Sequence, residues 1–348
     1  MKAAFLTGLR QMEIRDTPEP QLKGPHDVRL RIDAVGVCGS DVHYYTAGRI
    51  GSDVVKFPFI MGHECAGTVK EVGTEVRGLH PGQRVAIDPL ISCGQCDQCR
   101  AGRAHTCRNQ RFLGLPGQSE GALAEYLVLP EESCYPIPDG MTVEEAVLVE
   151  PLSIGVYAQR MAQMESGARV AILGVGPIGL SVLLACRAAA ECKVYVTDLI
   201  AERLNLASQL GAAWAGNPAQ YDVVRTIREA EPLGVDFAFE CAGKQETLDQ
   251  AVELLKPGGT LLIVGIPEAD RITFPIHTLR RKELAIKNVR RQNQCTAPTI
   301  NLVASGKINV APLITHHFTL QESQSAFDLV AGYRDGVVKA LIHMPGEP

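Results

Sequence analysis

The sequence predicts an α/β protein in which a β-rich domain is followed by a doubly wound parallel sheet. Two observations predict it. Residues 1–152 form short strand-like runs separated by glycine and proline, whereas from residue 153 onward strand-like runs alternate with helical stretches. The chain of 348 residues is also long enough for about two domains.

The β-rich domain is predicted from strands with a period of two. Residues 28–35 alternate apolar and polar side chains, as a half-buried strand should, and residues 67–73 and 83–87 are similar. Glycine and proline separate these runs, and no long amphipathic helix lies between them. We therefore expect residues 1–152 to form a small, irregular β domain that carries loops.

The second part of the chain has the rhythm of a parallel sheet. Its strand-like runs are residues 169–173, 193–198, 235–240 and 260–265, and its helical stretches are residues 178–190 and 201–210. Strands that alternate with helices in this way predict a parallel sheet covered on both faces.

A glycine-rich turn follows the first strand of this sheet. Gly174, Gly176 and Gly179 have the spacing G-x-G-x-x-G, and Pro177 and Ile178 open the next helix. The first glycine permits a tight turn, the second lets the backbone approach a pyrophosphate, and the third lets the helix pack on the strand. Free N–H groups at the helix N-terminus then face the phosphates. The turn predicts a dinucleotide site in a Rossmann domain; the alternative is a glycine turn without a ligand.

An acidic residue indicates the cofactor. Asp198 ends the second strand, where a carboxylate holds the ribose hydroxyls of NAD. It would repel a 2′-phosphate, and Leu199 and Ile200 offer no cation to bind one, so we predict NAD rather than NADP. Arg203, one turn further on, is either a cofactor contact or a surface arginine. The predicted cofactor contacts also include Val264 and Gly265.

Four cysteines predict a structural zinc site. Cys93, Cys96, Cys99 and Cys107 fall within fifteen residues, with gaps of two, two and seven. Zinc takes four ligands tetrahedrally and prefers thiolate sulfur. The residues between the cysteines could not build a core of their own, so a metal would hold the lobe. The alternatives are two disulfides or unrelated thiols, but close cysteines without a secretory signal favour a metal.

A second metal site is predicted in the same domain. Cys38, His63, Glu64 and Glu150 offer one thiol, one imidazole and two carboxylates. Such a set can bind zinc and leave a position for water or substrate, which is the open arrangement of catalytic zinc. By spacing alone this set is a weak signal, because a lone buried Cys or His more often packs than ligates.

Composition and charge argue against other classes. The chain is 46% hydrophobic and 21% charged, and its net charge of −5 gives no electrostatic case for nucleic acid or an anionic membrane. No apolar run approaches the ~20 residues of a membrane span, and the N-terminus is too short and interrupted for a signal peptide. We expect a reducing, cytoplasmic location, with most of the cysteines outside the lobe in the core.

Over essentially its whole length the chain resembles the zinc-dependent medium-chain alcohol dehydrogenase family. The matching segments are residues 36–43, 62–64 and 150–153, the four-cysteine lobe, the Gly174 turn and Asp198. Within the family it is most similar to the polyol branch, typified by sorbitol and xylitol dehydrogenases, through residues 38–44, 48–50, 149–153, 196–199 and 313–316.

The resemblance implies a domain arrangement. A GroES-like catalytic domain, made from both ends of the chain, would accompany a Rossmann domain, with the active site between them. We assign residues 1–152 to the catalytic domain and 153–288 to the Rossmann domain. Residues 289–348 would complete the Rossmann sheet and return to the catalytic domain. We also expect a homotetramer.

The resemblance also implies residue roles. Cys38, His63 and Glu64 would hold the catalytic zinc, and Glu150 would bind the zinc or its water. The remaining carried-over positions are Ser40 and His43 for proton relay, and Tyr44 and Arg291 for the polyol chain. The chain departs from the family where Phe-Arg-Tyr is replaced by residues 290–292, Arg-Arg-Gln. It also keeps the four lobe cysteines, which mammalian sorbitol dehydrogenases have lost.

The expected activity is that of a zinc-dependent NAD oxidoreductase with two zinc ions per chain. It would oxidise a secondary alcohol of a sorbitol-, xylitol- or iditol-like polyol to the ketose. A threonine- or butanediol-type dehydrogenase is the alternative within the family. A non-catalytic NAD- and zinc-binding protein and a zinc-ribbon nucleic-acid binder are alternatives of other classes. The cysteine spacing and the charge oppose the ribbon, and the intact set of Cys38, His63, Glu64 and His43 opposes a non-catalytic protein.

Overall fold

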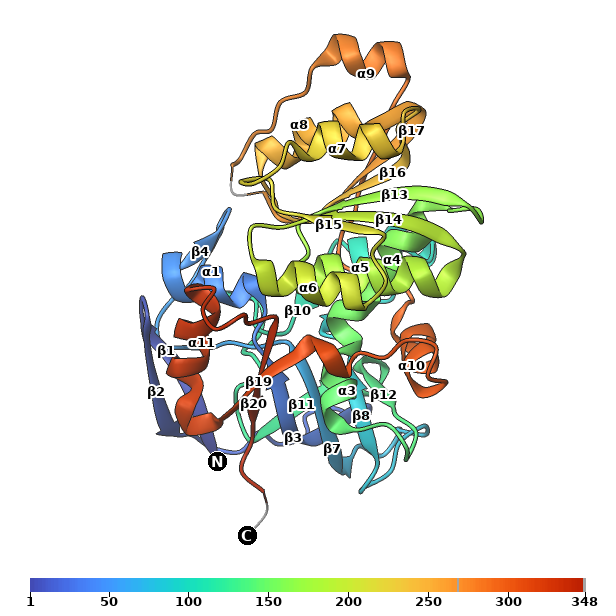
Figure 1. Ribbon diagram of the computed structural model, residues 1–348. Helices are drawn as coiled ribbons and strands as arrows, with labels where there is room; N and C mark the ends of the chain where they lie inside the picture. Colours follow the sequence, from blue (N-terminus) through green and yellow to red (C-terminus); the bar gives the residue numbers. More distant parts are fainter. Residues whose placement is uncertain (268, 347–348) are drawn as a thin grey trace. The chain divides into compact units, whose positions relative to one another are not determined.

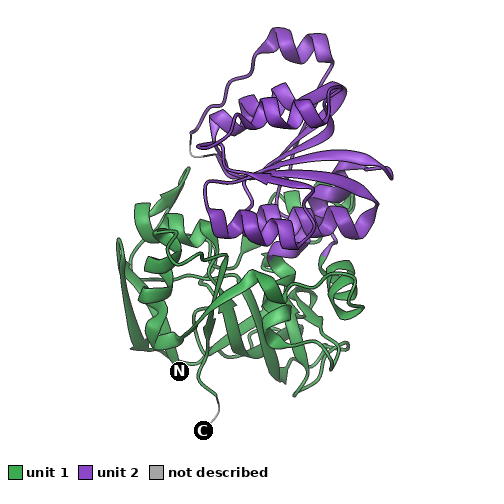
Figure 2. Cartoon of the chain, in the orientation of Figure 1, with its two compact units in different colours: residues 1–150, 296–348 green, residues 151–295 purple. Residues whose placement is uncertain are grey.

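The computed structural model describes residues 1–267 and 269–346 and divides into two compact units (Figure 2). The first unit is Met1–Glu150 with Thr296–Pro348, and the second is Pro151–Cys295. These limits differ from the expected 1–152, 153–288 and 289–348. Residues 289–295 belong to the second unit, and no described strand after residue 288 joins its sheet. The C-terminal segment supplies strands to the first unit instead.

The first unit is built on a seven-stranded sheet with the order β12-β8-β7-β3-β20-β19, and β11 also pairs with β3. The strands are β3 (Asp27–Gly36), β7 (Glu64–Val72), β8 (Arg84–Ile87), β11 (Tyr126–Pro130), β12 (Cys134–Pro136), β19 (Ile314–Thr319) and β20 (Lys339–His343). One edge of β3 is shared, because residues 27–31 pair with β11 and residues 34–36 pair with β20. Strands from opposite ends of the sequence thus lie side by side (Figure 1).

Shorter elements surround this sheet. The strands are β1 (Lys2–Gly8), β2 (Gln11–Asp16), β4 (Arg49–Ile50), β5 (Asp53–Val54), β6 (Phe59–Ile60), β9 (Leu90–Ile91) and β10 (Arg111–Phe112). The α-helices are α1 (Gly39–Ala47), α2 (Asp97–Arg100), α3 (Val143–Val147), α10 (Thr296–Ala304) and α11 (Ser323–Ala331). The 3-10 turns are η1 (Ala104–Thr106), η2 (Glu131–Ser133), η3 (Ala311–Leu313) and η4 (Leu320–Glu322). The unit's core buries alternate residues of β3, and the rings of Tyr45 and Phe327 pack with centroids 5.3 Å apart.

The second unit is a six-stranded parallel sheet with the order β15-β14-β13-β16-β17-β18. Its strands are β13 (Ala168–Leu173), β14 (Cys192–Thr197), β15 (Trp214–Gly216), β16 (Val235–Glu240), β17 (Leu255–Ile263) and β18 (Ala285–Asn288). Its helices are α5 (Pro177–Ala189), α6 (Ala201–Gln209), α7 (Val223–Ala230), α8 (Gln245–Leu254) and α9 (Ile276–Lys282), while α4 (Val149–Ala162) begins just before the unit. Figure 1 shows α5 and α6 on one face and α7 and α8 on the other. This confirms the doubly wound sheet, whose strand order reverses between β13 and β16.

Within the described ranges, no helix is both long enough and apolar enough to cross a bilayer.

Candidate functional site

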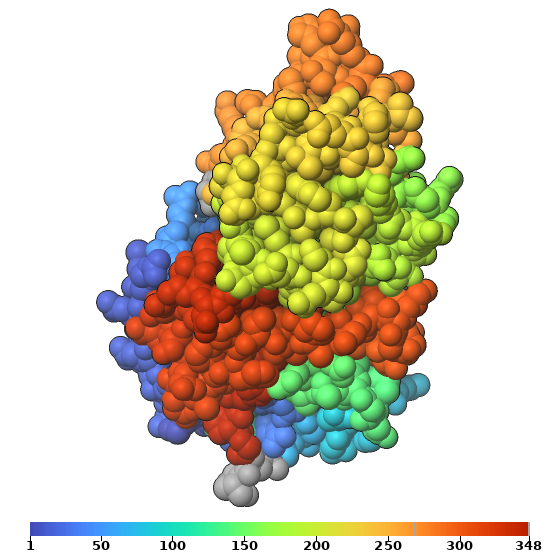
Figure 3. All heavy atoms as spheres, viewed as in Figure 1, coloured from blue at the N-terminus to red at the C-terminus, as the bar shows by residue number. Residues whose placement is uncertain are grey.

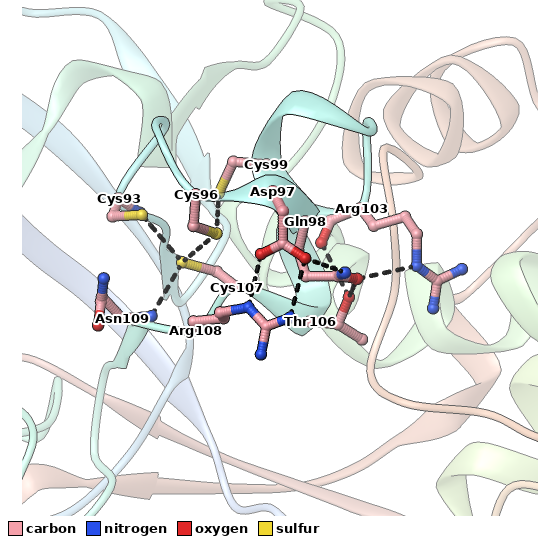
Figure 4. A network of polar contacts seen from close by, with 10 residues as sticks. All are labelled: Cys93, Cys96, Asp97, Gln98, Cys99, Arg103, Thr106, Cys107, Arg108 and Asn109. Carbon is pink, nitrogen blue, oxygen red and sulfur yellow. Dashed lines mark hydrogen bonds and ion pairs between the residues drawn. The ribbon is translucent and has the colours of Figure 1, made fainter.

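The four lobe cysteines face one another (Figure 4). Sγ of Cys107 lies 3.4 Å from Sγ of Cys93 and 3.9 Å from that of Cys96, which is 3.6 Å from Sγ of Cys99. Thiolates held about 2.3 Å from one zinc ion are about 3.8 Å apart, whereas a disulfide needs about 2.0 Å. The distances therefore suit a shared metal, and no cysteine in the described part of the chain forms a disulfide.

Polar contacts rather than a core hold this lobe. Cys96 is the N-cap of the short helix α2, and the next residue, Asp97, forms a two-pronged ion pair with Arg108 at 2.5 and 2.9 Å. The backbone N–H of Asn109 points at Sγ of Cys107, 3.4 Å away. Hydrogen bonds from the backbone at Arg108 and Cys99 lower the pKa of Cys96 to about 6, which favours the thiolate that zinc requires.

The predicted catalytic residues begin where β3 gives way to α1. Cys38 is the N-cap of α1, and the hydroxyl of Ser40 donates to its sulfur at 3.3 Å. His63, just before β7, is buried, and its Nδ1 lies 3.5 Å from Oδ1 of the fully buried Asp41. Burial alone would lower the pKa of His63, but Asp41 and Cys38 raise it well above its usual value. Asp41 lies on the Nδ1 side of the ring, so Nε2 is the nitrogen that could bind a metal.

Sequence reasoning missed the partner of Glu64. Glu64 and Lys339 are each 1% exposed, and Nζ of Lys339 lies 2.5 Å from Oε2 of Glu64. The same ammonium donates to the carbonyl of Val37 at 3.2 Å. Lys339 is on the last strand, β20, which the sheet places beside β3. The short apolar run at residues 340–342 could have indicated that strand, but no local signal reveals its pairing.

Glu150 is buried in the first turn of α4. Burial raises its pKa to about 7, and its Oε2 has no hydrogen-bond partner among the described residues. An unpaired, buried carboxylate oxygen suits a group that binds a cation or a polar ligand.

The predicted catalytic ligands are neighbours but not a closed cluster. Among the described residues, no three of Cys38, His63, Glu64 and Glu150 have ligand atoms all within 4.8 Å of one another, although the lobe cysteines do. Lys339 also pairs with one carboxylate oxygen of Glu64, a member of this set. The donor set of one thiol, one imidazole and buried carboxylates still fits zinc.

The remaining predicted active-site residues are dispersed. Ser40 and His43 are both on α1, three positions apart and therefore on one side of the helix. Tyr44 is 3% exposed and packs in the core of the first unit. Arg291 lies in the second unit with a left-handed backbone (φ 53°), and the next residue, Gln292, is buried and accepts from the N–H of Cys295 at 2.8 Å.

The glycine turn has the geometry that its spacing requires. Gly174 has φ +90°, and a Cβ on Gly179 would lie 2.0 Å from the carbonyl oxygen of Gly174. Only glycine therefore lets α5 start this close to β13. Gly176 is the N-cap and Pro177 the first residue of α5, which leaves the helix N-terminus open for phosphate.

The acid at the end of β14 faces this turn. Asp198 accepts from the N–H of Val175 at 2.8 Å and from that of Ile200 at 3.0 Å, while Leu199 is 69% exposed. Arg203 is not a surface arginine: it is 8% exposed, and its guanidinium lies 3.3 Å from where a Cβ on Gly176 would stand.

Sequence reasoning also missed Glu240. This buried residue ends β16 at the reversal of strand order, and one carboxylate oxygen accepts from the N–H groups of Ala242 and Gly243 at 2.8 and 2.7 Å. Its carbonyl accepts from the N–H groups of Val264 and Gly265, both at 2.8 Å. Glu240 thus joins the loops after β16 and β17 beside the glycine turn.

These features define a class of protein, and comparisons with known proteins give the same one. Residues 24–139 match the alcohol dehydrogenase GroES-like domain, and residues 177–305 match the zinc-binding dehydrogenase family. The chain belongs to the zinc-binding alcohol dehydrogenase family.

Individual members of the family are similar to the chain over nearly its whole length. Sorbitol dehydrogenase of Bacillus subtilis is 35% identical over 99% of this chain and 97% of its own length. L-idonate 5-dehydrogenase of Vitis vinifera is 38% identical over 94% of this chain and 91% of its own. A zinc-binding dehydrogenase of Sinorhizobium meliloti, solved with bound NADP, is 32% identical with a TM-score of 0.90 over 98% of both chains. The resemblance to polyol dehydrogenases is thus confirmed at the level of the family.

Proposed function

We propose that the protein oxidises a secondary alcohol of a polyol or sugar-acid chain to the ketone, with NAD as acceptor and zinc at the active site. The observation that carries the proposal is nearly full-length similarity to sorbitol and L-idonate dehydrogenases. The buried polar set around Glu150 supports it, because unpaired buried polar groups favour a ligand rich in hydroxyls and reject apolar ones.

The residues have separate tasks in this proposal. Cys38, His63, Glu64 and Glu150 would hold the catalytic zinc, and the four lobe cysteines would hold a structural one. When bound, zinc supplies Lewis acidity and NAD the hydride acceptor. Ser40, whose hydroxyl is 3.3 Å from the sulfur of Cys38, takes the proton of the substrate hydroxyl and passes it towards His43 and solvent. Arg291 and Tyr44 remain candidates for substrate contact.

The substrate is tested by turnover. The purified protein, loaded with zinc, should reduce NAD with C4–C6 polyols and L-idonate at a higher kcat/KM than with 2-propanol, 2,3-butanediol or threonine. Ser40→Ala should lower kcat with little change in KM, because it removes a proton carrier and not a binding group. A higher kcat/KM for 2-propanol than for every polyol would replace the proposal by a general secondary-alcohol dehydrogenase.

The cofactor is tested separately. Asp198 supports NAD as the cofactor. NADP is the alternative to test, because Arg203 is buried beside the glycine turn and the S. meliloti relative was solved with NADP. Wild type should prefer NAD, and Asp198→Ala should raise the KM for NAD and narrow the gap to NADP. Equal use of both cofactors by wild type would contradict the role of Asp198.

We also propose a cytoplasmic homotetramer. The thiols of the cysteine lobe, which need a reducing environment to bind metal, support the compartment, and the family resemblance supports the assembly. Light scattering should give four times the chain mass of 37.5 kDa, and a monomer or dimer would refute the assembly.

A further inference from the structure

Three metal-ligating side chains that the proposed function does not use meet on the first unit. Glu144 lies in the first turn of α3, His317 on β19 and His343 on β20. In the parallel pairing, His317 stands opposite Leu341, so His343 is two residues further along β20 and on the same face of the sheet. Figure 3 shows the C-terminal segment, orange to red, at the surface of the molecule beside a green patch.

The three ligand atoms form a nearly regular triangle. Nδ1 of His317 lies 3.0 Å from Nε2 of His343, and Oε1 of Glu144 lies 3.5 and 3.6 Å from these two nitrogens. A point equidistant from all three is about 2.0 Å from each, which is the bond length of zinc to imidazole nitrogen and carboxylate oxygen. The edges are also close to the ~3.3 Å that separates ligands of a tetrahedral zinc ion.

Hydrogen bonding alone does not account for this arrangement. One imidazole nitrogen donates to the other, but the carboxylate oxygen is beyond the ~2.7–3.2 Å of a direct hydrogen bond from either ring. The rings of His317 and His343 are stacked at 22° with centroids 5.2 Å apart, and the two nitrogens lie close to each other and to the same carboxylate oxygen.

We propose that Glu144, His317 and His343 form a third metal site, which takes zinc or another first-row divalent cation of borderline softness. Two imidazoles and one carboxylate select such ions over magnesium and calcium. The side chains are 37–50% exposed, so the fourth position is open to water. The metal would tie helix α3 to the two C-terminal strands.

The site is tested by counting metal. Full-length wild type, His317→Asn, His343→Asn and Glu144→Gln are dialysed to equilibrium against buffered zinc at pH 7.5, and bound zinc per chain is measured by elemental analysis. Wild type should bind one more zinc ion per chain than either histidine variant. The Glu144→Gln variant should need a higher free zinc concentration than wild type to fill half of its third sites. With Cu²⁺, the electron paramagnetic resonance spectrum of wild type should show coupling to two nitrogens, and that of each histidine variant to one fewer.

His26 offers a matched control. It is an exposed histidine whose Nε2 lies 3.0 Å from Oε2 of Glu75, and among the described residues it belongs to no group of three possible metal ligands. His26→Asn should bind as much zinc as wild type. Equal zinc content in wild type, His317→Asn and His343→Asn would overturn the proposal, and so would an equal loss in His26→Asn, which would show non-specific surface binding.

Discussion

Lys339→Met removes the cation from the buried pair that joins β20 to β7 and keeps a side chain of similar length. Glu64, 1% exposed, is then left without the ammonium group that lies 2.5 Å away in wild type. The carboxylate must either stay ionised without its cation or take up a proton in order to remain buried.

The loss in the free energy of unfolding is set by whichever of these two alternatives costs less free energy. Protonating a glutamate with an ordinary pKa of about 4.3 costs about 1.4 kcal/mol for each pH unit above that value, which gives about 5 kcal/mol at pH 8 and about 2 kcal/mol at pH 6. Removing one partner of a buried pair typically costs about 3–5 kcal/mol, which agrees. Because the variant folds with Glu64 protonated, its pKa is raised in the folded state, so the stability deficit grows as pH rises. At about 2–4 °C per kcal/mol, the fall in Tm should be about 10–20 °C at pH 8.

The assay is thermal unfolding of chelator-treated protein at pH 6, 7 and 8. Lys256→Met is the control, because Lys256 pairs with Asp236 but is 42% exposed, and such a pair contributes about 1 kcal/mol or less. The double variant Lys339→Met/Glu64→Gln should recover part of the loss at pH 8. If Lys339→Met lowered Tm no more than Lys256→Met, or equally at all three pH values, the ion-pair reasoning would be refuted.

Three further changes test the cysteine lobe, the glycine turn and a charge cluster. Cys96→Ser should lose one zinc ion per chain by elemental analysis and lower Tm by several degrees; an unchanged zinc content would contradict the lobe's role. Gly179→Ala would place a methyl group 2.0 Å from the carbonyl of Gly174, so NADH binding, followed by fluorescence, should weaken more than tenfold. Burial raises the pKa of Glu231, but hydrogen bonds from Tyr195 (2.5 Å) and a lysine outweigh it and hold the pKa below its usual value. Glu231→Gln should therefore cost about 2 kcal/mol at pH 7, measured by urea unfolding, and the deficit should vanish as pH falls through the folded pKa; a deficit unchanged at low pH would count against this assignment.

The second unit was predicted well because its signals are local. A parallel strand buried on both faces appears in the sequence as a short apolar run, so residues 169–173 predict β13 to within one residue. The glycine turn and the cysteine lobe are likewise set by spacing along a few residues. By contrast, β17 begins at Leu255, five residues before the predicted run, because its start includes lysine, proline and two glycines.

The surroundings of the candidate catalytic residues were harder to predict from the sequence, because their partners come from distant segments of the chain. Asp41 looks like one polar residue of a turn, and only the fold places it against His63. Lys339 looks like an ordinary charged residue near the end of the chain, yet it is buried beside Glu64. The predicted ligand set therefore did not include the lysine that pairs with one of its members.

The shared edge of β3 has a consequence for synthesis on the ribosome. The first unit is completed by β20, which is translated only after the whole of residues 151–295, whereas the second unit is continuous and can fold as soon as it emerges. Until then, residues 34–36 of β3 remain an open strand edge and Glu64 has no counter-charge. The N-terminal part of the first unit therefore stays incompletely folded, and prone to aggregation, until β20 has been synthesised.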